Sequence, residues 1–288
     1  MDRAAPIEGT CLLALTLGEL IFCLITGALG GLLGGFLGIG GSLVMIPMLA
    51  VYFGPEDQHL YQAAAMIVNL FVALAAVIRH RRAAAVRVDA LKGMIPSAIV
   101  LIIIGVLVSN QFPGEILARL FAIFLVYVIL MNTRKLIYRW RHPLPKGVRR
   151  NATEDAKENP IPLPKSVFVG SVMGFMAGLL GIGGGGVAVP MQQVVFRIPL
   201  KQCIGTSTAV ICVTAGIGAF VKNLTLDQAG AGFSVDRSLL IASALVPGAI
   251  VGSFLGAILT HRLPNQLVRL VFIILMIVAA AKMSGLWD

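Results

Sequence analysis

Charged side chains are scarce in this sequence. Asp, Glu, Lys and Arg together make up 12% of its 288 residues, whereas 58% are hydrophobic and the mean hydropathy is +0.92. Soluble domains carry roughly twice that share of charge. The shortage excludes a soluble globular protein and predicts an all-α polytopic membrane protein.

Cysteine is rare, and the residue sets of familiar active sites are missing. The four cysteines lie in or beside apolar segments without CxxC spacing, which excludes a disulfide framework and indicates packing residues. There is no HExxH or Walker motif, no buried Ser–His–Asp set, and none of the four histidines is deep in an apolar segment. We therefore expect no catalytic residue, metal ion or cofactor.

The basic balance does not indicate a nucleic-acid partner. The net charge is +10, but the basic residues cluster in loops between apolar runs, as in cytoplasmic loops beside anionic lipid. The first ten residues hold one basic and two acidic side chains, a poor start for a signal peptide, so the first apolar segment is expected to remain. The charge pattern instead makes membrane lipid an expected partner, with a homo-oligomer left open.

Apolar segments fall into two groups separated by a polar stretch. They cover 11–37, 42–53, 61–78, 93–109 and 115–133, then 166–182, 186–196, 203–221, 238–260 and 265–284. The stretch between them carries nine Lys and Arg, three acids and five prolines, which makes it too charged to cross a membrane. The chain therefore divides into a first membrane repeat, a linker and a second membrane repeat, at 1–133, 134–165 and 166–288.

The two groups repeat each other. Residues 95–131 align with 246–282 without a gap, and the pairs Pro96 with Pro247 and Gly105 with Gly256 are identical. A repeated membrane unit is typical of two bundles related by a pseudo-twofold axis.

Loop charges predict the orientation of the repeats. Loop 79–92 holds five Lys and Arg against one Asp, so it is expected in the cytoplasm together with the linker. Loops 54–60 and 110–115 carry only acids, and loop 222–238 is balanced, so these fit the outside. This pattern places both termini outside, on the side opposite the cytoplasm. It also gives each repeat an odd number of crossings, which makes the repeats inverted.

Two glycine-rich motifs stand at matching places in the repeats. Gly38-Ile-Gly-Gly41 and Gly181-Ile-Gly-Gly184 are 143 positions apart and are followed by Pro47 and Pro190. We call residues 38–41 the first break and residues 181–184 the second break. Glycine weakens a helix, and a broken membrane helix strands polar backbone groups, so paired breaks indicate a transporter's binding site.

The segments after the breaks are too short for an ordinary crossing. Segments 42–53 and 186–196 span roughly 18 Å of helix against a core of about 30 Å. They either cross as short broken helices or form hairpins with the preceding helix. We favour two glycine-broken hairpins that enter from opposite faces with their tips near the midplane, each followed by three membrane-crossing helices.

Other interpretations of the glycines were weighed. Gly181, Gly183 and Gly186 form a literal GxGxxG, but a nucleotide fold needs a preceding strand and an acidic residue about 20 positions later, and neither is present. Helix packing is a serious alternative for the flanking glycines, though it does not require four in a row.

The sequence favours an anion cradle. A helix that starts just after a break points free N–H groups and the positive end of its dipole at that break. Hydroxyls follow the second break at Thr206 and Ser207, beside Gly205, and these side chains either donate to an oxyanion or cap their helix. The first repeat has Ala64, Ala65 and Met66 there, so the site is expected to be asymmetric.

These motifs resemble the TauE/SafE sulfite exporter family over nearly the whole chain outside the linker. The resemblance rests on the paired glycine–proline patterns and on Ile204-Gly-Thr-Ser207. It implies a bacterial inner-membrane permease for sulfite, sulfonates or related sulfur anions. The family's motif positions map to the glycines, Pro47, Pro190, Gly205, Thr206 and Ser207, and the missing hydroxyls of the first repeat are a departure from the pattern.

We therefore expect a secondary transporter that exports a small sulfur oxyanion. A permease for another small anion or metabolite and a non-transporting membrane scaffold are the alternatives. The predicted substrate-binding residues are Gly38, Gly40, Gly41, Ser42, Pro47, Asn69, Gly181, Gly183, Gly184, Gly185, Gly186, Pro190, Gln192, Gly205, Thr206 and Ser207.

Overall fold

The computed structural model describes residues 15–54, 57–141, 160–229, 233–262 and 277. Throughout these ranges the chain is helical and contains no strand. The helices are α1 (Leu17–Leu37), α2 (Ser42–Phe53), α3 (Gln58–Arg82), α4 (Val88–Ser109), α5 (Gly114–Arg141), α6 (Leu163–Leu180), α7 (Gly185–Val195), α8 (Leu200–Leu224), the 3₁₀ turn η1 (Leu226–Ala229) and α9 (Val235–Arg262).

Seven of the helices in the described ranges are long and apolar enough to cross a membrane. They are α1, α3, α4, α6 and α8, with Gly114–Met131 of α5 and Val235–Thr260 of α9. The prediction of an all-α polytopic membrane protein is confirmed. Helices α2 and α7 have only 12 and 11 residues, as expected for the segments after the breaks. The predicted last segment, 265–284, lies outside the described residues.

Helices extend into both ends of the predicted linker. Helix α5 continues to Arg141 and α6 begins at Leu163, so both ends of the 134–165 stretch are helical. Lys and Arg are good helix formers, and a helix does not have to end where its apolar stretch ends. The charged residues after position 133 therefore mark the end of the apolar region, whereas α5 itself continues beyond it.

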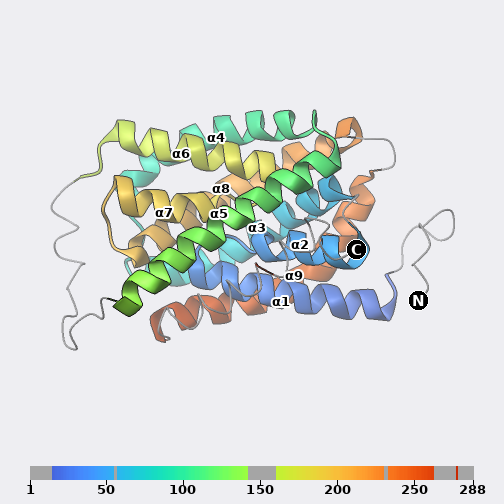
Figure 1. Ribbon diagram of the computed structural model, residues 1–288, viewed down its shortest axis with the longest axis horizontal. Helices are drawn as coiled ribbons and strands as arrows, with labels where there is room; N and C mark the ends of the chain where they lie inside the picture. Colours follow the sequence, from blue (N-terminus) through green and yellow to red (C-terminus); the bar gives the residue numbers. More distant parts are fainter. Residues whose placement is uncertain (1–14, 55–56, 142–159, 230–232, 263–276, 278–288) are drawn as a thin grey trace.

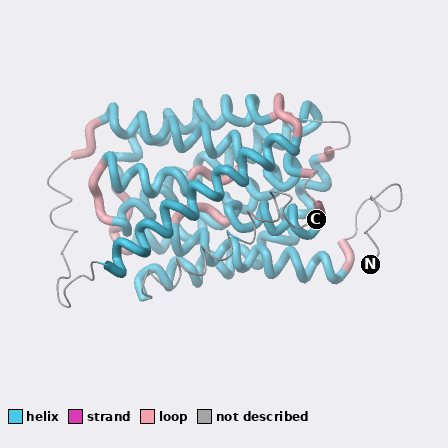
Figure 2. The backbone as a smooth tube through the Cα atoms, in the orientation of Figure 1, coloured by secondary structure: helices cyan, strands magenta, loops and turns pink. Residues whose placement is uncertain are grey.

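Helices of the two repeats alternate across the bundle. Figure 1 shows α1 beside α9 along one long side and α4 beside α6 along the other, with α3 and α8 between them. Helix α1 starts at the right of the view, whereas its counterpart α6 starts at the left. Figure 2 shows short non-helical segments in the middle of the bundle, away from both ends.

Glycines allow the close approach of these helix pairs. A Cβ added to Gly27 or Gly31 of α1 would lie 2.2 Å from a carbonyl oxygen of α9, that of Leu245 or Ala249. The equivalent residues of α6, Gly170 and Gly174, meet Met94 and Ala98 of α4 in the same way. The contact of α1 with α9 is therefore matched by the contact of their counterparts, α6 with α4. Such an exchange is the pattern of two repeats related by a pseudo-twofold axis.

Adding a methyl group to this contact should destabilise the bundle. We expect Gly31→Ala to lower the stability of the folded state by about 1–3 kcal/mol, because α1 and α9 must move apart to hold the methyl group. The matched control is Gly18→Ala in the same helix, where an added Cβ meets nothing within 4 Å. Thermal unfolding in detergent measures both, and equal melting temperatures would contradict the packing role.

Candidate functional site

The two breaks meet in the interior of the bundle. A Cβ added to Gly185, the first residue of α7, would lie 2.4 Å from Cα of Ile39, so the start of α7 presses against the first break. Both breaks contain left-handed residues, Gly40 (φ 80°) in the first and Gly183 (φ 67°) and Gly184 (φ 79°) in the second. Glycine adopts this conformation without steric cost, which explains why breaks of this shape need it.

The first break is closed by a side chain. Asn69 on α3 accepts hydrogen bonds through Oδ1 from the amides of Gly41 (2.7 Å) and Ser42 (3.1 Å). Its Nδ2 donates to Oγ of Ser42 at 2.8 Å. All three residues are buried, and the donors at the start of α2 are therefore satisfied by the protein itself.

The second break has no such cap. Helices α3 and α8 are both 25 residues long and offset by 142 positions, so Asn69 corresponds to Ile211 on α8. Isoleucine cannot accept a hydrogen bond. The amides of Gly184, Gly185 and Gly186 have no acceptor among the described residues, although all three are buried. Buried N–H groups without a partner are rare, and here they converge at a helix N-terminus.

The hydroxyls after the second break divide between two tasks. Ser207 donates to the carbonyl of Gly38 at 3.0 Å, which ties α8 to the first break. Thr206 instead accepts from the backbone amide of Arg87 at 3.0 Å. Gly205 faces the same loop, since an added Cβ would lie 2.5 Å from the carbonyl oxygen of Ala85. Ser207 therefore links α8 of the second repeat to the first break, whereas Thr206 and Gly205 hold the connection between α3 and α4.

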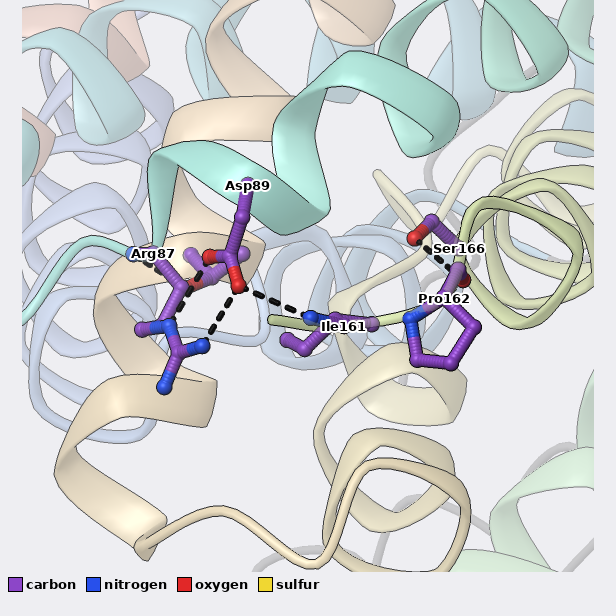
Figure 3. Close-up of polar contacts among 6 residues, drawn as sticks. Arg87, Asp89, Ile161, Pro162 and Ser166 are labelled. Carbon is purple, nitrogen blue, oxygen red and sulfur yellow. Dashed lines mark hydrogen bonds and ion pairs between the residues drawn. The ribbon is translucent and has the colours of Figure 1, made fainter. Parts of the chain in front are cut away.

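This connection is anchored at one end of the bundle. Figure 3 shows Asp89 at the start of α4 between the guanidinium of Arg87 and the amide of Ile161, which leads into α6. The hydrogen bond from Arg87 Nε to Asp89 is 2.8 Å long, and the bond from the Ile161 amide is 3.0 Å. The hydrogen bond and charge of Asp89 raise the pKa of Arg87. The anchor joins α4, α6 and α8 outside the breaks.

The remaining predicted residues surround the breaks in α2 and α7. Pro47 and Pro190 lie inside these helices, where a proline removes the donor for the carbonyl four residues earlier. The acceptors left free are the carbonyls of Leu43 and Gly186. Gln192 on α7 is fully buried, and neither amide atom of its side chain has a hydrogen-bond partner in the described part of the chain.

The burial of three polar side chains was missed by the sequence interpretation. Lys222 was assigned to an outer loop, but it belongs to α8 and is 0% exposed. His59 and His80 are near the ends of α3 as predicted, yet both are buried. Position along an apolar segment does not reveal burial, because neighbouring helices and loops cover the segment ends. One signal for the burial of Lys222 was available in the sequence. The apolar pattern of α8 continues for a further turn, and this lysine lies in that turn.

Comparison with known proteins finds similarity along nearly the whole chain. The family model described as sulfite exporter TauE/SafE matches residues 23–283. The probable membrane transporter protein YunE of Bacillus subtilis is 26% identical over 281 residues, which cover 91% of this chain and 96% of YunE. The probable membrane transporter protein MJ0441 of Methanocaldococcus jannaschii is 27% identical, covering 86% of this chain and 88% of MJ0441.

A longer relative contains the same region as one part. The probable membrane transporter protein MamO of Paramagnetospirillum magneticum is 26% identical over 276 residues, which cover 88% of this chain but 42% of MamO. The chain thus spans under half the length of that relative. No solved structure matches the chain. The match of the family model across nearly all of the sequence shows that this chain belongs to the TauE/SafE sulfite exporter family.

Proposed function

We propose that this protein is a secondary transporter that exports a small sulfur oxyanion, sulfite or an organosulfonate, across the bacterial inner membrane. The observation that carries the proposal is the set of buried amides at Gly184, Gly185 and Gly186, which have no acceptor in the part of the chain that the structure describes. An oxyanion offers several acceptor oxygens at once, and hydrogen bonds to a charged group are worth about 1.5–3 kcal/mol each. The N-terminus of α7 adds a positive potential.

The proposed site is asymmetric. Asn69 already occupies the donors of the first break, so the substrate is held by the second break and by α7. Gln192, whose buried side-chain amide has no partner among the described residues, is the proposed side-chain ligand. Ser207 on α8 ties the second repeat to the first break through the Gly38 carbonyl, and this bond can respond to substrate because its donor and acceptor come from different repeats.

We further propose that the repeats are inverted, with both termini in the periplasm. The opposite starting ends of α1 and α6 and the exchanged glycine contacts support an inverted relation. The basic residues of loop 79–92 and of the linker support a cytoplasmic end that includes the Arg87–Asp89 anchor. The hairpins formed by α1 with α2 and by α6 with α7 would then enter from opposite faces.

Cysteine accessibility tests this orientation. In a cysteine-free background we expect Arg150→Cys to resist a membrane-impermeant thiol reagent in intact cells, because the linker is predicted to be cytoplasmic. Asp57→Cys, in a loop predicted to be outside, is the control and should react. Labelling of the linker variant in sealed cells would reverse the proposed orientation.

A binding panel tests the substrate class. The purified protein in detergent is melted with sulfite, sulfate, thiosulfate, taurine, sulfoacetate or chloride, since a ligand of the folded state raises apparent stability by RT ln(1 + [L]/Kd). We expect sulfite or a sulfonate to stabilise the protein most, and reconstituted vesicles to release the same anion. Stabilisation by a different anion would identify another permease, whereas no stabilisation and no transport would favour a scaffold.

A further inference from the structure

Lys222 is held as an ammonium ion by three neutral acceptors. Its Nζ lies 2.9 Å from His59 Nδ1, 2.8 Å from Ser109 Oγ and 2.7 Å from Asn110 Oδ1. Three acceptors require three hydrogens on the nitrogen, and a neutral amine has only two. The hydrogen-bond geometry therefore assigns the charged form of this lysine.

Each of the three neighbours is fixed as an acceptor by its other contact. His59 Nε2 is 3.0 Å from the Phe112 carbonyl, so Nε2 carries the hydrogen and Nδ1 accepts. Ser109 donates its hydroxyl to the Val106 carbonyl. Asn110 donates through Nδ2 to Thr225 Oγ1 at 2.7 Å, which leaves Oδ1 toward the lysine.

Within the described ranges, no acidic side chain forms an ion pair with this buried ammonium. The described part of the chain contains ion pairs of Arg87 with Asp89 and of Arg119 with Glu115, and none includes Lys222. A buried ion without a counter-charge is costly, whereas an ion buried beside its counter-ion is tolerated. The protein keeps a positive charge inside an apolar bundle, and a small anion would supply the missing charge.

Unpartnered amides lead from this lysine to the second break. Gln58 immediately precedes His59 in the first turn of α3, and Gln62 follows one turn later on the same face. Both side chains are 0% exposed, and none of their four amide atoms has a partner in the described residues. Gln62 reaches the second break, because a Cβ added to Gly181 would lie 2.8 Å from Gln62 Cγ.

The opposite helix offers no equivalent path. The positions on α8 that correspond to Gln58 and Gln62 are Leu200 and Ile204, both apolar. The counterpart of Lys222 on α3 is His80, whose Nε2 lies 3.3 Å from the Gly35 carbonyl. The pair of glutamines beside a buried lysine therefore has no counterpart at the matching positions of α8 and α3.

We propose that Lys222, Gln58 and Gln62 form a second anion site, which passes a small oxyanion between the end of the bundle where α3 begins and the second break. The inference rests on the proposed function, and it adds the residues along which the anion would move. The oxyanion approaches the ammonium, which exchanges one neutral acceptor for it. The free amides of Gln58 and Gln62 then donate to the oxyanion on its way to the amides of α7.

The test compares Lys222→Met and Gln62→Leu with the wild type in the full chain. We expect each variant to need at least tenfold more sulfite for half-maximal stabilisation in detergent or for half-maximal flux in reconstituted vesicles. Lys222→Arg keeps the positive charge and should recover part of the affinity. Lys201→Met is the matched control, because it removes a lysine that is exposed at the opposite end, and it should match the wild type.

The readouts separate this inference from the proposed function and from a folding defect. A lower melting temperature with an unchanged sulfite concentration dependence would give Lys222 and Gln62 a structural role and overturn the second site. Wild-type-like flux in both variants would overturn it as well. A wild type that responds to no anion would instead refute the proposed function, and with it the site that rests on it.

Discussion

Replacing Asn69 by leucine should unfold the first break. Leucine has nearly the same size but cannot hydrogen bond, so the amides of Gly41 and Ser42 and the hydroxyl of Ser42 would lose their partner in the interior. A buried polar group without a partner costs about 1–3 kcal/mol, and three such groups predict a loss of roughly 3 kcal/mol or more. We expect a clearly lower melting temperature and little folded protein at 37 °C.

The control for this prediction is another amide. Asn223→Leu on α8 removes a bond of 2.8 Å from Nδ2 to the Ala219 carbonyl within the same helix, and it should cost about 1 kcal/mol or less. Melting curves in detergent compare the two variants directly. If both variants melted together, Asn69 would not be the cap that stabilises the first break.

Introducing the missing cap should close the second break. We expect Ile211→Asn to place an amide oxygen where Asn69 stands in the other repeat, within reach of the amides at the start of α7. Ile211 is close to the second break, since an added Cβ on Gly183 would lie 3.5 Å from its Cγ2. The variant should then bind sulfite about tenfold or more weakly, because the lost bonds to a charged group are worth about 1.5–3 kcal/mol each and 1.4 kcal/mol is tenfold.

Ile211→Val is the matched control for this substitution. It keeps an apolar side chain of similar shape, so the anion-dependent stabilisation should stay close to that of the wild type. The measurement is the sulfite concentration that gives half-maximal thermal stabilisation. Undiminished binding by Ile211→Asn would remove the amides of α7 from the proposed site.

The structure changes the interpretation of one glycine in the second break. Gly184 is one of the predicted substrate-binding residues, so a methyl group on it would enter the anion cradle if the residue lined that site. In the structure an added Cβ would lie 2.6 Å from the carbonyl oxygen of Met173, and the residue has a φ of 79°. Loss of function in Gly184→Ala would therefore report strain and a clash with α6, so Ile211→Asn is the more informative variant.

The sequence alone determined the class of fold, the repeat and the position of both breaks. These features depend on local properties: the length of an apolar run, the effect of glycine on a helix, and the spacing between equivalent motifs. They also led to the family, because its motifs are contiguous stretches such as Gly38-Ile-Gly-Gly41 and Ile204-Gly-Thr-Ser207.

Only the tertiary structure decided which polar groups are satisfied. Thr206 and Ser207 are neighbours in sequence, yet one contacts the Arg87 amide and the other the Gly38 carbonyl, because successive residues of a helix face different directions. The cap of the first break comes from Asn69, 27 residues after Ser42, and the burial of Lys222 depends on partners more than 100 positions away. Contacts over such separations depend on how the helices pack, which no local pattern specifies.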